Sequence, residues 1–456
     1  MFSGMKEVNM RILLINTPFH SAYKKFTQEF PPLGIAYIAG MLRKSGHDVH
    51  LLDLNASDTG EYPGFRRFDL IGISADTPRH DKALALAAQA REHQVPVALG
   101  GPHVSFLPEE SLKSGYVDYV VRGEGEYPML YLAEFLAGER SLEDVPAVSY
   151  LLEGEAVHNP DQCIAKDIDS LPFPARDLLP MDKYRTHLNK KRATSMISSR
   201  GCPFNCSFCA SSQLFGARWR AREPEAIVDE IEHVQQRYQV SNILFVDDNF
   251  TLDPQRTVRI SELICKKDLN IQWLCFSRVN TIVENEDMVQ GMAESGVRMM
   301  FLGVESPDPR VLESYNKKIT AETSFRALEI LKKYSIDALA SFIIGNLNED
   351  SRMIKNTIRF ANKLNPKTAQ FSILTPYPGT RLYNEVKDRI LTFDWSRYDG
   401  MHATIKPDRV RAEELERLIK KAYVSFYLHP GKILAHPVAG MRNLFMVPRL
   451  LKAQSS

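Results

Sequence analysis

The sequence lacks the features that mark several large classes of protein. Its 456 residues include only six cysteines, too few to hold a chain of this length together as a disulfide scaffold. The formal charge at pH 7 is +1, so the chain has no strong positive field to attract nucleic acid. No uninterrupted apolar run approaches the roughly 20 residues that span a bilayer, and the N-terminal segment has no small-residue cleavage site of a secretory signal. These absences predict a soluble, cytoplasmic protein that does not bind nucleic acid.

The first part of the chain has the pattern of a doubly wound α/β domain. Hydrophobic residues make up 44% of the sequence and charged residues 25%, an ordinary globular composition with enough length for two or three domains. Up to about Val157, short β-branched runs alternate with amphipathic helices, as in a parallel sheet covered on both faces. The expected strands are 11–16, 48–54, 70–74, 95–100 and 118–123.

The alternation stops and then starts again. Residues 159–192 are rich in proline and aspartate and are predicted to form an extended linker. From Ala193, six further strand patterns separated by helices predict a partial (βα)6 barrel. We therefore expect a doubly wound parallel-sheet domain at 1–158, the linker at 159–192, the partial barrel at 193–394 and a helical C-terminal region at 395–456.

Three cysteines, Cys202, Cys206 and Cys209, are crowded into the stretch "SSRGCPFNCSFCASS". The stretch follows the first strand of the second unit, at the carboxyl end of a strand, where barrels place their chemistry. A C-x3-C-x2-C run supplies three thiolates, so an iron–sulfur cube bound there would keep one iron without a protein ligand. A zinc site would need a fourth ligand, and the nearest later candidates, His233 and Cys265, lie on predicted helices. The residues between the cysteines are typical of loops, which disfavours the alternative that the cysteines are buried in a core without a ligand.

This stretch resembles the hallmark of the radical S-adenosylmethionine superfamily, C-x3-C-x-aromatic-C, with Phe208 as the aromatic residue. The resemblance covers most of residues 190–395. It implies a 4Fe-4S cluster held by the three cysteines, with S-adenosylmethionine chelating the open iron and Phe208 near the adenine. It also implies an electron donor such as flavodoxin or ferredoxin, whose electron releases a 5′-deoxyadenosyl radical.

Polar residues at the ends of the next two barrel strands extend this candidate site. Asp247 and Asp248, in "FVDDNF", are expected to hold the ammonium of the methionine moiety, whereas a helix-capping role fits Asp253 better. Arg278, in "FSR", is a candidate carboxylate clamp, with a surface ion pair as the equal alternative.

The later strand ends resemble further motifs of the superfamily. "FLGVES" resembles the fourth-strand ribose motif, in which Gly303 admits a close backbone approach and Glu305 accepts hydrogen bonds from ribose hydroxyls. "SFIIGNLNED" resembles the fifth-strand motif but has Leu347 and Asn348 where proline and glycine are expected. "TPYPGT" is similar to the sixth-strand end of the cobalamin-dependent group.

The first domain resembles the cobalamin-binding domain that precedes the barrel in that group. The segments that carry the resemblance are "PPLGIAYIAGMLRKSGHDVHLLD", "GISADT", "LGGPHVSFLPEE" and "VVRGEGE". A doubly wound sheet binds its ligand over the carboxyl strand ends, where glycine turns leave room for a flat macrocycle. The candidate cobalamin contacts are the turn glycines and three polar residues that could bond corrin amides: Gly72, Gly100, Gly101, Gly123, Gly125, Ser74, Thr77 and Glu126.

Two motifs are missing from the first domain. No G-x-G-x-x-G follows the first strand, which disfavours a plain dinucleotide site. The D-x-H-x-x-G motif that places a histidine on cobalt is also missing, so no lower axial histidine is predicted. His103, in "GGPH", is a candidate for the lining of the cobalamin site, with a loop histidine of no functional role as the equal alternative.

Together the resemblances imply an enzyme that forms or rearranges bonds at unactivated carbon, with C-methylation as the leading interpretation. The adenosyl radical would abstract hydrogen from the substrate, methylcobalamin would deliver a methyl group, and a second S-adenosylmethionine would remethylate the cobalt. An oxidative cyclase or another non-methylating member is the alternative, and a corrinoid carrier without catalysis is a distant one, because a carrier has no use for an open iron. No residue selects the substrate, a small molecule or a lipid-like one, and no catalytic acid or base is assigned.

Two features lie outside these motifs. Cys163, Cys265 and Cys275 are expected to serve core packing. The tail that begins near Phe426 interleaves bulky apolar residues with lysine and arginine. It is expected to be a packing arm over the open side of the barrel or, alternatively, an interfacial segment in peripheral contact with an anionic membrane.

Overall fold

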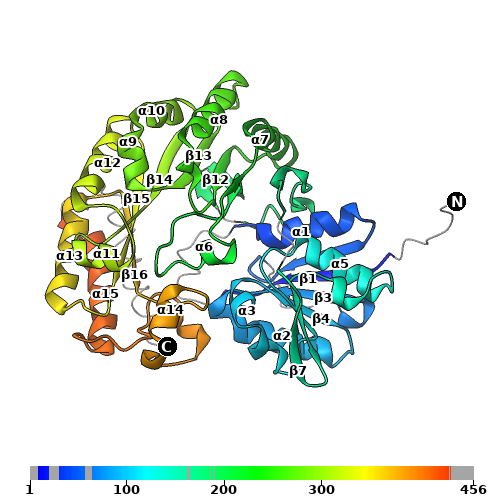
Figure 1. The fold of residues 1–456 in the computed structure, drawn as a ribbon. Helices are drawn as coiled ribbons and strands as arrows, with labels where there is room; N and C mark the ends of the chain where they lie inside the picture. Colours follow the sequence, from blue (N-terminus) through cyan, green and yellow to red (C-terminus); the bar gives the residue numbers. More distant parts are fainter. Residues whose placement is uncertain are drawn as a thin grey trace.

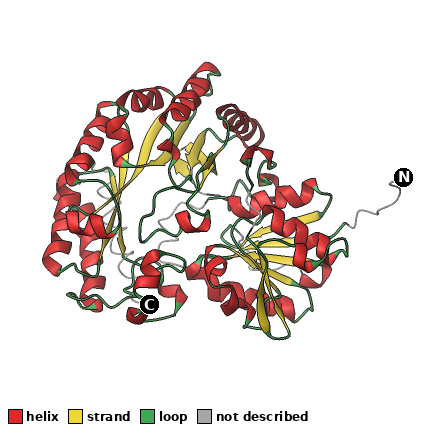
Figure 2. Ribbon diagram, in the orientation of Figure 1, coloured by secondary structure: helices red, strands yellow, loops and turns green. Residues whose placement is uncertain are grey.

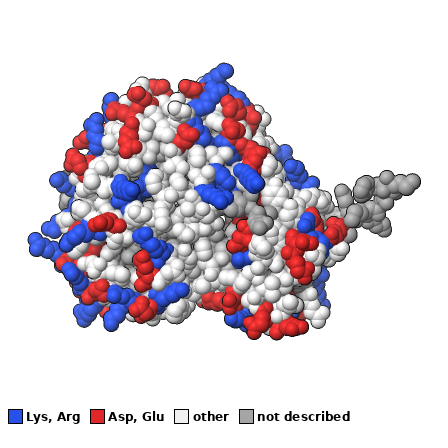
Figure 3. Space-filling view, viewed as in Figure 1, with Lys and Arg blue, Asp and Glu red and all other residues white. Residues whose placement is uncertain are grey.

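The computed structural model places the chain in two α/β units that lie side by side (Figure 1, Figure 2). Each unit is built on a seven-stranded sheet. Lysine and arginine are intermixed with aspartate and glutamate on the face drawn in Figure 3, in keeping with the net charge of +1. Within the described ranges, no helix is long and apolar enough to cross a membrane. The described residues are 9–19, 30–56, 64–161, 165–184, 186–188, 191–430 and 432.

The first sheet has the five parallel strands that the sequence predicts, and their order is β2-β1-β3-β4-β5. Two antiparallel strands, β6 and β7, follow at one edge. Every residue of β1 after Arg11 is buried, because helices cover the sheet on both faces. The strands are β1 (Arg11–Asn16), β2 (Asp48–Asp53), β3 (Leu70–Ser74), β4 (Val97–Gly100), β5 (Tyr119–Val121), β6 (Val148–Leu152) and β7 (Glu155–His158). The longer helices are α1 (Leu33–Lys44), α2 (His80–Arg91) and α5 (Glu126–Leu136).

The sequence pattern does not predict the β6–β7 hairpin. Its two-residue turn is Glu153 and Gly154, whose φ angles are 51° and 88°. Short hairpin turns with positive φ at both central residues favour Asn-Gly or Asp-Gly, because a glutamate rarely adopts this conformation. A Glu-Gly pair is therefore a weak turn signal, and the sheet is mixed rather than purely parallel.

The second sheet curls into an open barrel with its helices on the outside (Figure 1). Its order is β16-β15-β14-β13-β12-β9-β8, and only β8 is antiparallel to its neighbour. The strands are β8 (His187–Leu188), β9 (Lys191–Met196), β12 (Asn242–Phe245), β13 (Gln272–Ser277), β14 (Val297–Glu305), β15 (Asp337–Ile344) and β16 (Thr368–Ile373). The longer helices are α7 (Pro224–Tyr238), α8 (Pro254–Lys266), α10 (Glu286–Glu294), α12 (Ala321–Lys333), α13 (Ser351–Leu364) and α15 (Ala412–Tyr427). The six βα units expected from the sequence are confirmed.

Helix α15 covers the outer edge of β16. The hydroxyl of Tyr423 donates to the Phe371 carbonyl at 2.9 Å and accepts from the Phe371 amide at 3.2 Å. The hydroxyl of Tyr427 does the same for Ala369, at 2.7 and 3.1 Å. An edge strand exposes unpaired backbone groups, so these two tyrosines replace the bonds that a further strand would make. The predicted packing arm or membrane segment begins near Phe426, and the part of it after residue 432 lies outside the described residues.

A buried ion cluster fastens the predicted linker to the barrel. Arg176, on η6 (Arg176–Leu178), donates to Glu230 of α7 at 2.7 Å, and Arg222 also pairs with this carboxylate. Burial alone would raise the pKa of Glu230, but the two arginines lower it. β9 begins at Lys191, inside the range predicted for the linker. The domain limits themselves stay a prediction.

The cysteines outside the cluster differ in burial. Cys275, on β13, is fully buried, as core packing requires. Cys265, on α8, is exposed, so the prediction of core packing is wrong for this residue. The helical pattern alone placed it on an amphipathic helix without fixing which face it occupies. Cys163 lies outside the described residues.

Candidate functional site

The three clustered cysteines line one cavity at the carboxyl ends of the barrel strands. Cys202, Cys206 and Cys209 are half-buried and lie between β10 (Ser199–Arg200) and α6 (Ser211–Leu214). The cavity measures about 410 Å³, and we call it the thiol cavity. Burial raises the pKa of Cys202 to about 11 and also raises that of Cys209. A thiol binds a metal as the thiolate, so a bound cationic group would reverse this effect, and the donor set of three fits a cluster with one open iron.

The loop that carries the cysteines is held just before the motif and within it. Gly201 has a φ of 82°, and a β-carbon there would overlap the carbonyl oxygen of Arg218. Within the motif, the buried Ser207 accepts from the Leu382 amide at 2.9 Å and donates its amide to the Tyr315 carbonyl at 3.1 Å. The three thiols are therefore fixed in place by backbone contacts with two distant segments.

Several predicted S-adenosylmethionine contacts lie in the thiol cavity. The ring of Phe208 meets Tyr315 edge to face, with centroids 5.1 Å apart. The guanidinium of Arg278 lies 3.9 Å from the ring centroid of Phe204. Gly303 also lines the cavity, where a β-carbon would collide with the Glu305 carboxylate.

Glu305 is buried in the wall of this cavity with a φ of 66°. Its carboxylate forms a buried ion pair with Lys317 and accepts from the Ser341 hydroxyl at 3.3 Å. The sequence motif predicts Glu305 as a ribose ligand but gives no sign of Lys317, which comes 12 residues later, beyond the end of α11 (Pro309–Ser314). A ribose would share this carboxylate with the ammonium of Lys317.

The two aspartates predicted to hold the methionine ammonium have different surroundings. Asp247 is buried, and its Oδ1 accepts from the Ser198 amide at 2.9 Å and from the Ser199 hydroxyl at 2.7 Å. This oxygen therefore anchors β10, while Oδ2 has no hydrogen-bond partner among the described residues. Asp248 is exposed and lines the thiol cavity. The capping role foreseen for Asp253 is confirmed, since its side chain accepts from the Arg256 amide at 3.0 Å.

Asn249 was not singled out by the sequence pattern. It follows the two aspartates, is 1% exposed and lines the thiol cavity. Neither its side-chain oxygen nor its side-chain nitrogen has a hydrogen-bond partner in the described part of the chain. A buried amide without partners is costly, so the cavity is built for a polar ligand that both donates and accepts.

A second cavity, of about 290 Å³, lies between the two units, and we call it the glycine cavity. From the first unit it is lined by Gly72, Ser74, Gly100, Gly101, Gly123, Gly125 and Glu126. From the second unit, Ile197, Arg200, Phe215 and Asp248 are among the lining residues. The carboxyl ends of β1 and β3, where the strand order reverses, face this region, as in other doubly wound sheets.

Glycine is required at two positions of the glycine cavity. Gly101 has a φ of 117°, and a β-carbon there would overlap the carbonyl oxygen of Ala75. Gly123 has a φ of 69°, and a β-carbon there would meet no atom within 4 Å, so the missing side chain leaves space open to a ligand. The glycine cavity thus fits a broad ligand that approaches the backbone closely.

Two of the predicted cobalamin contacts do not line the glycine cavity, and a third lines it but is already paired. Thr77 is buried on η3 (Thr77–Arg79), and it is not among the described residues that line the glycine cavity. His103 is also missing from this lining, because it is buried on α3 (Pro102–Phe106), where its ring centroid lies 4.7 Å from that of Trp395. Glu126 does line the cavity, but its carboxylate accepts from Arg200 at 2.6 Å.

Comparisons with known proteins match each of the two units. The family model for the radical SAM superfamily matches residues 196–361, and the model for the B12 binding domain matches residues 21–133. The chain is 39% identical to an uncharacterized methyltransferase of Pyrococcus horikoshii, over 93% of this chain and 94% of that one. It is 30% identical to an anaerobic magnesium-protoporphyrin IX monomethyl ester cyclase of Rubrivivax gelatinosus, over 92% of this chain and 78% of that one. It is 28% identical to a hopanoid C-3 methylase of Methylococcus capsulatus, over 92% and 81%.

Two solved structures share the fold. The cobalamin-dependent S-adenosylmethionine radical enzyme OxsB, with aqua-cobalamin and S-adenosylmethionine bound, superposes with a TM-score of 0.77 at 18% identity, over 97% of this chain and 72% of that one. The methyltransferase TsrM of Kitasatospora setae, with cobalamin and a [4Fe-4S] cluster bound, has a TM-score of 0.69 at 18% identity, over 84% and 78%. The order of the two units along the chain is therefore a shared architecture.

Proposed function

This chain belongs to the family of radical SAM enzymes that carry a B12-binding domain, and we propose that within it the protein is a C-methyltransferase acting on an unactivated carbon of a small molecule. In this proposal Cys202, Cys206 and Cys209 hold a 4Fe-4S cluster, the thiol cavity takes S-adenosylmethionine, and the glycine cavity takes cobalamin. When bound, these groups supply one-electron cleavage of S-adenosylmethionine and a transferable methyl group.

The observation that carries the proposal is the meeting of the two cavities at Asp248. This residue, just after β12, lines both the thiol cavity and the glycine cavity. A substrate carbon placed beside Asp248 would be within reach of groups bound on either side. Because a carbon radical reacts with its nearest neighbour, this proximity decides the product.

The residues of the chain would bind and orient the ligands. Asn249 offers an unpartnered donor and acceptor to a polar ligand in the thiol cavity, and Arg278 offers a cation for a carboxylate. Phe208, in the lining of this cavity, offers an aromatic ring to a flat base. On the other side, the apolar walls of the glycine cavity, among them Ile197 and Phe215, would exclude water from the junction.

An oxidative cyclase is the second candidate. It is supported by the 30% identity with the cyclase of Rubrivivax gelatinosus, which is lower than the 39% identity with the methyltransferase of Pyrococcus horikoshii. Both reactions would use the thiol cavity in the same way. They differ in whether a methyl group enters the product.

The test is anaerobic incubation of the reconstituted enzyme with methyl-deuterated S-adenosylmethionine, a low-potential reductant, hydroxocobalamin and a cell extract. Mass spectrometry should find a product that carries the labelled methyl group, with 5′-deoxyadenosine and S-adenosylhomocysteine formed in about equal amounts because two molecules of S-adenosylmethionine are consumed. Formation of 5′-deoxyadenosine without a labelled product or S-adenosylhomocysteine would instead support the cyclase.

A matched pair of cysteine variants controls this experiment. Cys206→Ala should lose the cluster iron and form neither product. Cys265→Ala changes an exposed cysteine on α8, outside the thiol cavity, and should leave both unchanged. If Cys206→Ala kept its iron and its products, the assignment of the thiol cavity would be wrong.

A further inference from the structure

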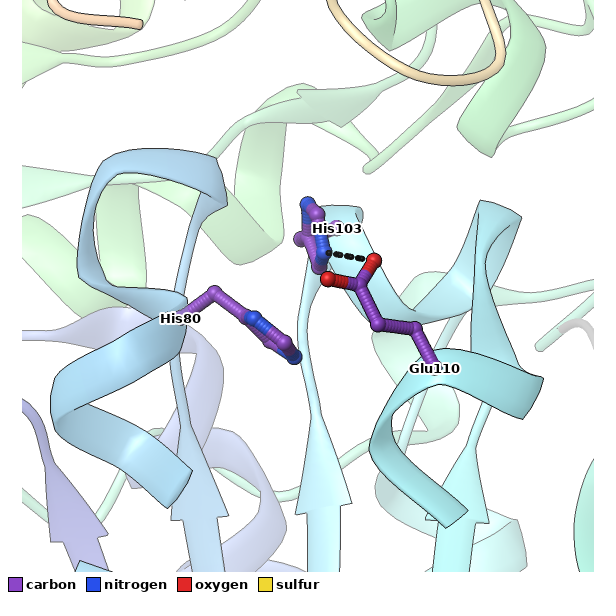
Figure 4. A group of neighbouring side chains, drawn as sticks. All are labelled: His80, His103 and Glu110. Atoms are coloured by element: carbon purple, nitrogen blue, oxygen red, sulfur yellow. Dashed lines mark ion pairs between the residues drawn. The ribbon is translucent and has the colours of Figure 1, made fainter. Parts of the chain in front are cut away.

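A compact group of metal-ligand side chains lies outside both cavities, in the first unit. His80 begins α2, His103 lies on α3, and Glu110 lies on α4 (Pro108–Leu112) (Figure 4). The three side chains point toward one another from three separate helices. One ligand atom from each lies within 4.8 Å of the other two. Neither histidine is among the residues that line the glycine cavity in the described part of the chain.

The spacing is close to that of a bound ion. The Nε2 atom of His103 lies 3.6 Å from Oε2 of Glu110. Two ligands that are each about 2.0 Å from a tetrahedral zinc ion are about 3.3 Å apart. The other donor–donor distances are at most 4.8 Å, so a movement of the side chains by roughly 1–1.5 Å would bring all three donors to the spacing of a bound ion.

The two imidazoles are buried without the hydrogen bonds that such groups need. His80 is 0% exposed and His103 is 1% exposed. Both ring nitrogens of His103 and Nδ1 of His80 have no hydrogen-bond partner among the described residues, and the nearest carboxylate oxygen to Nδ1 of His80 is Oδ1 of Asp81, at the longer distance of 3.6 Å. Each buried, unpartnered polar group costs about 1–3 kcal/mol, so three of them in one place call for a partner.

The surroundings of the group hold its side chains in place. The indole of Trp395 donates to Oε1 of Glu110 at 2.7 Å, which leaves Oε2 for another partner. The hydroxyl of Ser111 lies 2.8 Å from Nε2 of His80. Metal-ligating carboxylates and imidazoles are commonly fixed by such outer contacts. Trp395 belongs to the segment after the barrel, so the group joins the first unit to that segment.

We propose that His80, His103 and Glu110 bind a divalent zinc-class ion that fastens the segment around Trp395 to the first unit. Two imidazoles and one carboxylate suit Zn²⁺, with a water molecule in the fourth position. The ion would supply the missing partner to His103 and neutralise Glu110. The site is separate from the thiol cavity and does not depend on the proposed reaction.

The experiment measures zinc in the full-length, cluster-loaded protein after equilibration with Zn²⁺ and passage over a chelating resin. We expect about one zinc per chain beside the cluster iron, and a zinc absorption-edge spectrum with nitrogen and oxygen neighbours at about 2.0–2.1 Å rather than sulfur at about 2.3 Å. This distance separates the proposed site from zinc held by the cluster cysteines. Zinc should also raise the melting temperature, because an ion that binds only the folded chain stabilises it.

Variants assign the site. His103→Gln and Glu110→Gln should each lower the zinc content to about a tenth or less and remove the shift in melting temperature, while the cluster iron stays constant. Glu110→Gln keeps an oxygen for the Trp395 indole, so it tests the charge without removing that bond. His93→Gln is the matched control, because His93 also has an unpartnered ring nitrogen but lies outside the group. Wild-type protein without zinc, or zinc with sulfur neighbours only, would overturn the proposal, as would a loss of zinc in His93→Gln equal to that in His103→Gln.

Discussion

At the scale of the residue, Glu305 and Lys317 form the most constrained ion pair of the thiol cavity. They are 4% and 8% exposed, so each charge depends on the other for its stabilisation. Removal of one partner from a buried pair costs about 3–5 kcal/mol, because the remaining charge stays in a poorly solvating environment. We expect Glu305→Gln to lower the free energy of unfolding by about 3 kcal/mol or more, measured by chemical denaturation followed by circular dichroism.

The double variant Glu305→Gln with Lys317→Met is the control for this prediction. It removes both charges and should regain much of the lost stability, since replacing a whole buried pair is often nearly neutral. If the single and the double variant lose the same free energy, the ion pair does not account for the effect. If high salt removes the difference in free energy of unfolding between wild type and Glu305→Gln, the pair is solvent-exposed.

Residue identities within a local motif were predictable, and long-range partners were not. Phe208 and the three cysteines were found because they lie within eight positions, so spacing alone indicates their shared role. Asp247 was expected at an open mouth, but Ser198 and Ser199, 49 and 48 residues earlier, take up one of its oxygens. Lys317 and Trp395 were missed for the same reason, because their partners are set by packing between elements rather than by neighbours in sequence.

At the scale of the element, the loop from β15 to α13 predicts a pH dependence. Glu349 is 1% exposed, and its Oε2 accepts from the amides of Gly345 and Asn346 at 2.8 Å. Burial raises the pKa of Glu349 from 4.5 to about 7, despite these two bonds. The folded protein therefore holds this proton to a higher pH than the unfolded chain. The contribution of Glu349 to the free energy of unfolding is therefore complete below about pH 4.5 and is lost as the pH rises through about 7.

Glu349→Gln removes that titration and keeps an oxygen for the two amides. Relative to wild type, the variant should gain roughly 2 kcal/mol in free energy of unfolding between pH 5 and pH 8, because only wild type carries a buried charge at the higher pH. Denaturant unfolding of the metal-free chain at both values measures this gain. Glu329→Gln, which changes an exposed carboxylate on α12, should show no such difference. A gain of equal size in the two variants would refute the role of burial.

Elements were predictable where one run of residues determines them. The parallel strands follow from short β-branched runs between amphipathic helices, and each was found within a few residues. The β6–β7 hairpin and the cover of β16 by Tyr423 and Tyr427 were not predicted. Both depend on backbone groups finding partners in another element, which a hydrophobic pattern does not record.

At the scale of the whole molecule, the feature that no single domain shows is the junction of the two cavities. Each motif set predicts a ligand site in its own unit, but only the packing of the units brings both sites to Asp248. That packing uses buried charge. Arg200 is 7% exposed, and its Nη2 donates to Oε1 of Glu126 at 2.6 Å. Its Nη1 lies 3.4 Å from Oε2 of Glu124, and its guanidinium carbon lies 5.1 Å from the ring centroid of Tyr37.

Arg200→Gln therefore should open the junction. Glu124 and Glu126 of the first unit both line the glycine cavity, and the variant removes the Arg200 cation that pairs with them. Because a buried carboxylate that loses its partner is destabilised, we expect cobalamin to bind at least about tenfold more weakly. Titration with hydroxocobalamin followed by absorbance measures the affinity, and small-angle X-ray scattering should show a larger radius of gyration as the units separate. Arg259→Gln breaks an exposed pair with Glu225 and should change neither quantity, because surface ion pairs contribute little. An unchanged cobalamin affinity in Arg200→Gln, with the same scattering curve as wild type, would mean that Arg200 does not hold the two units together.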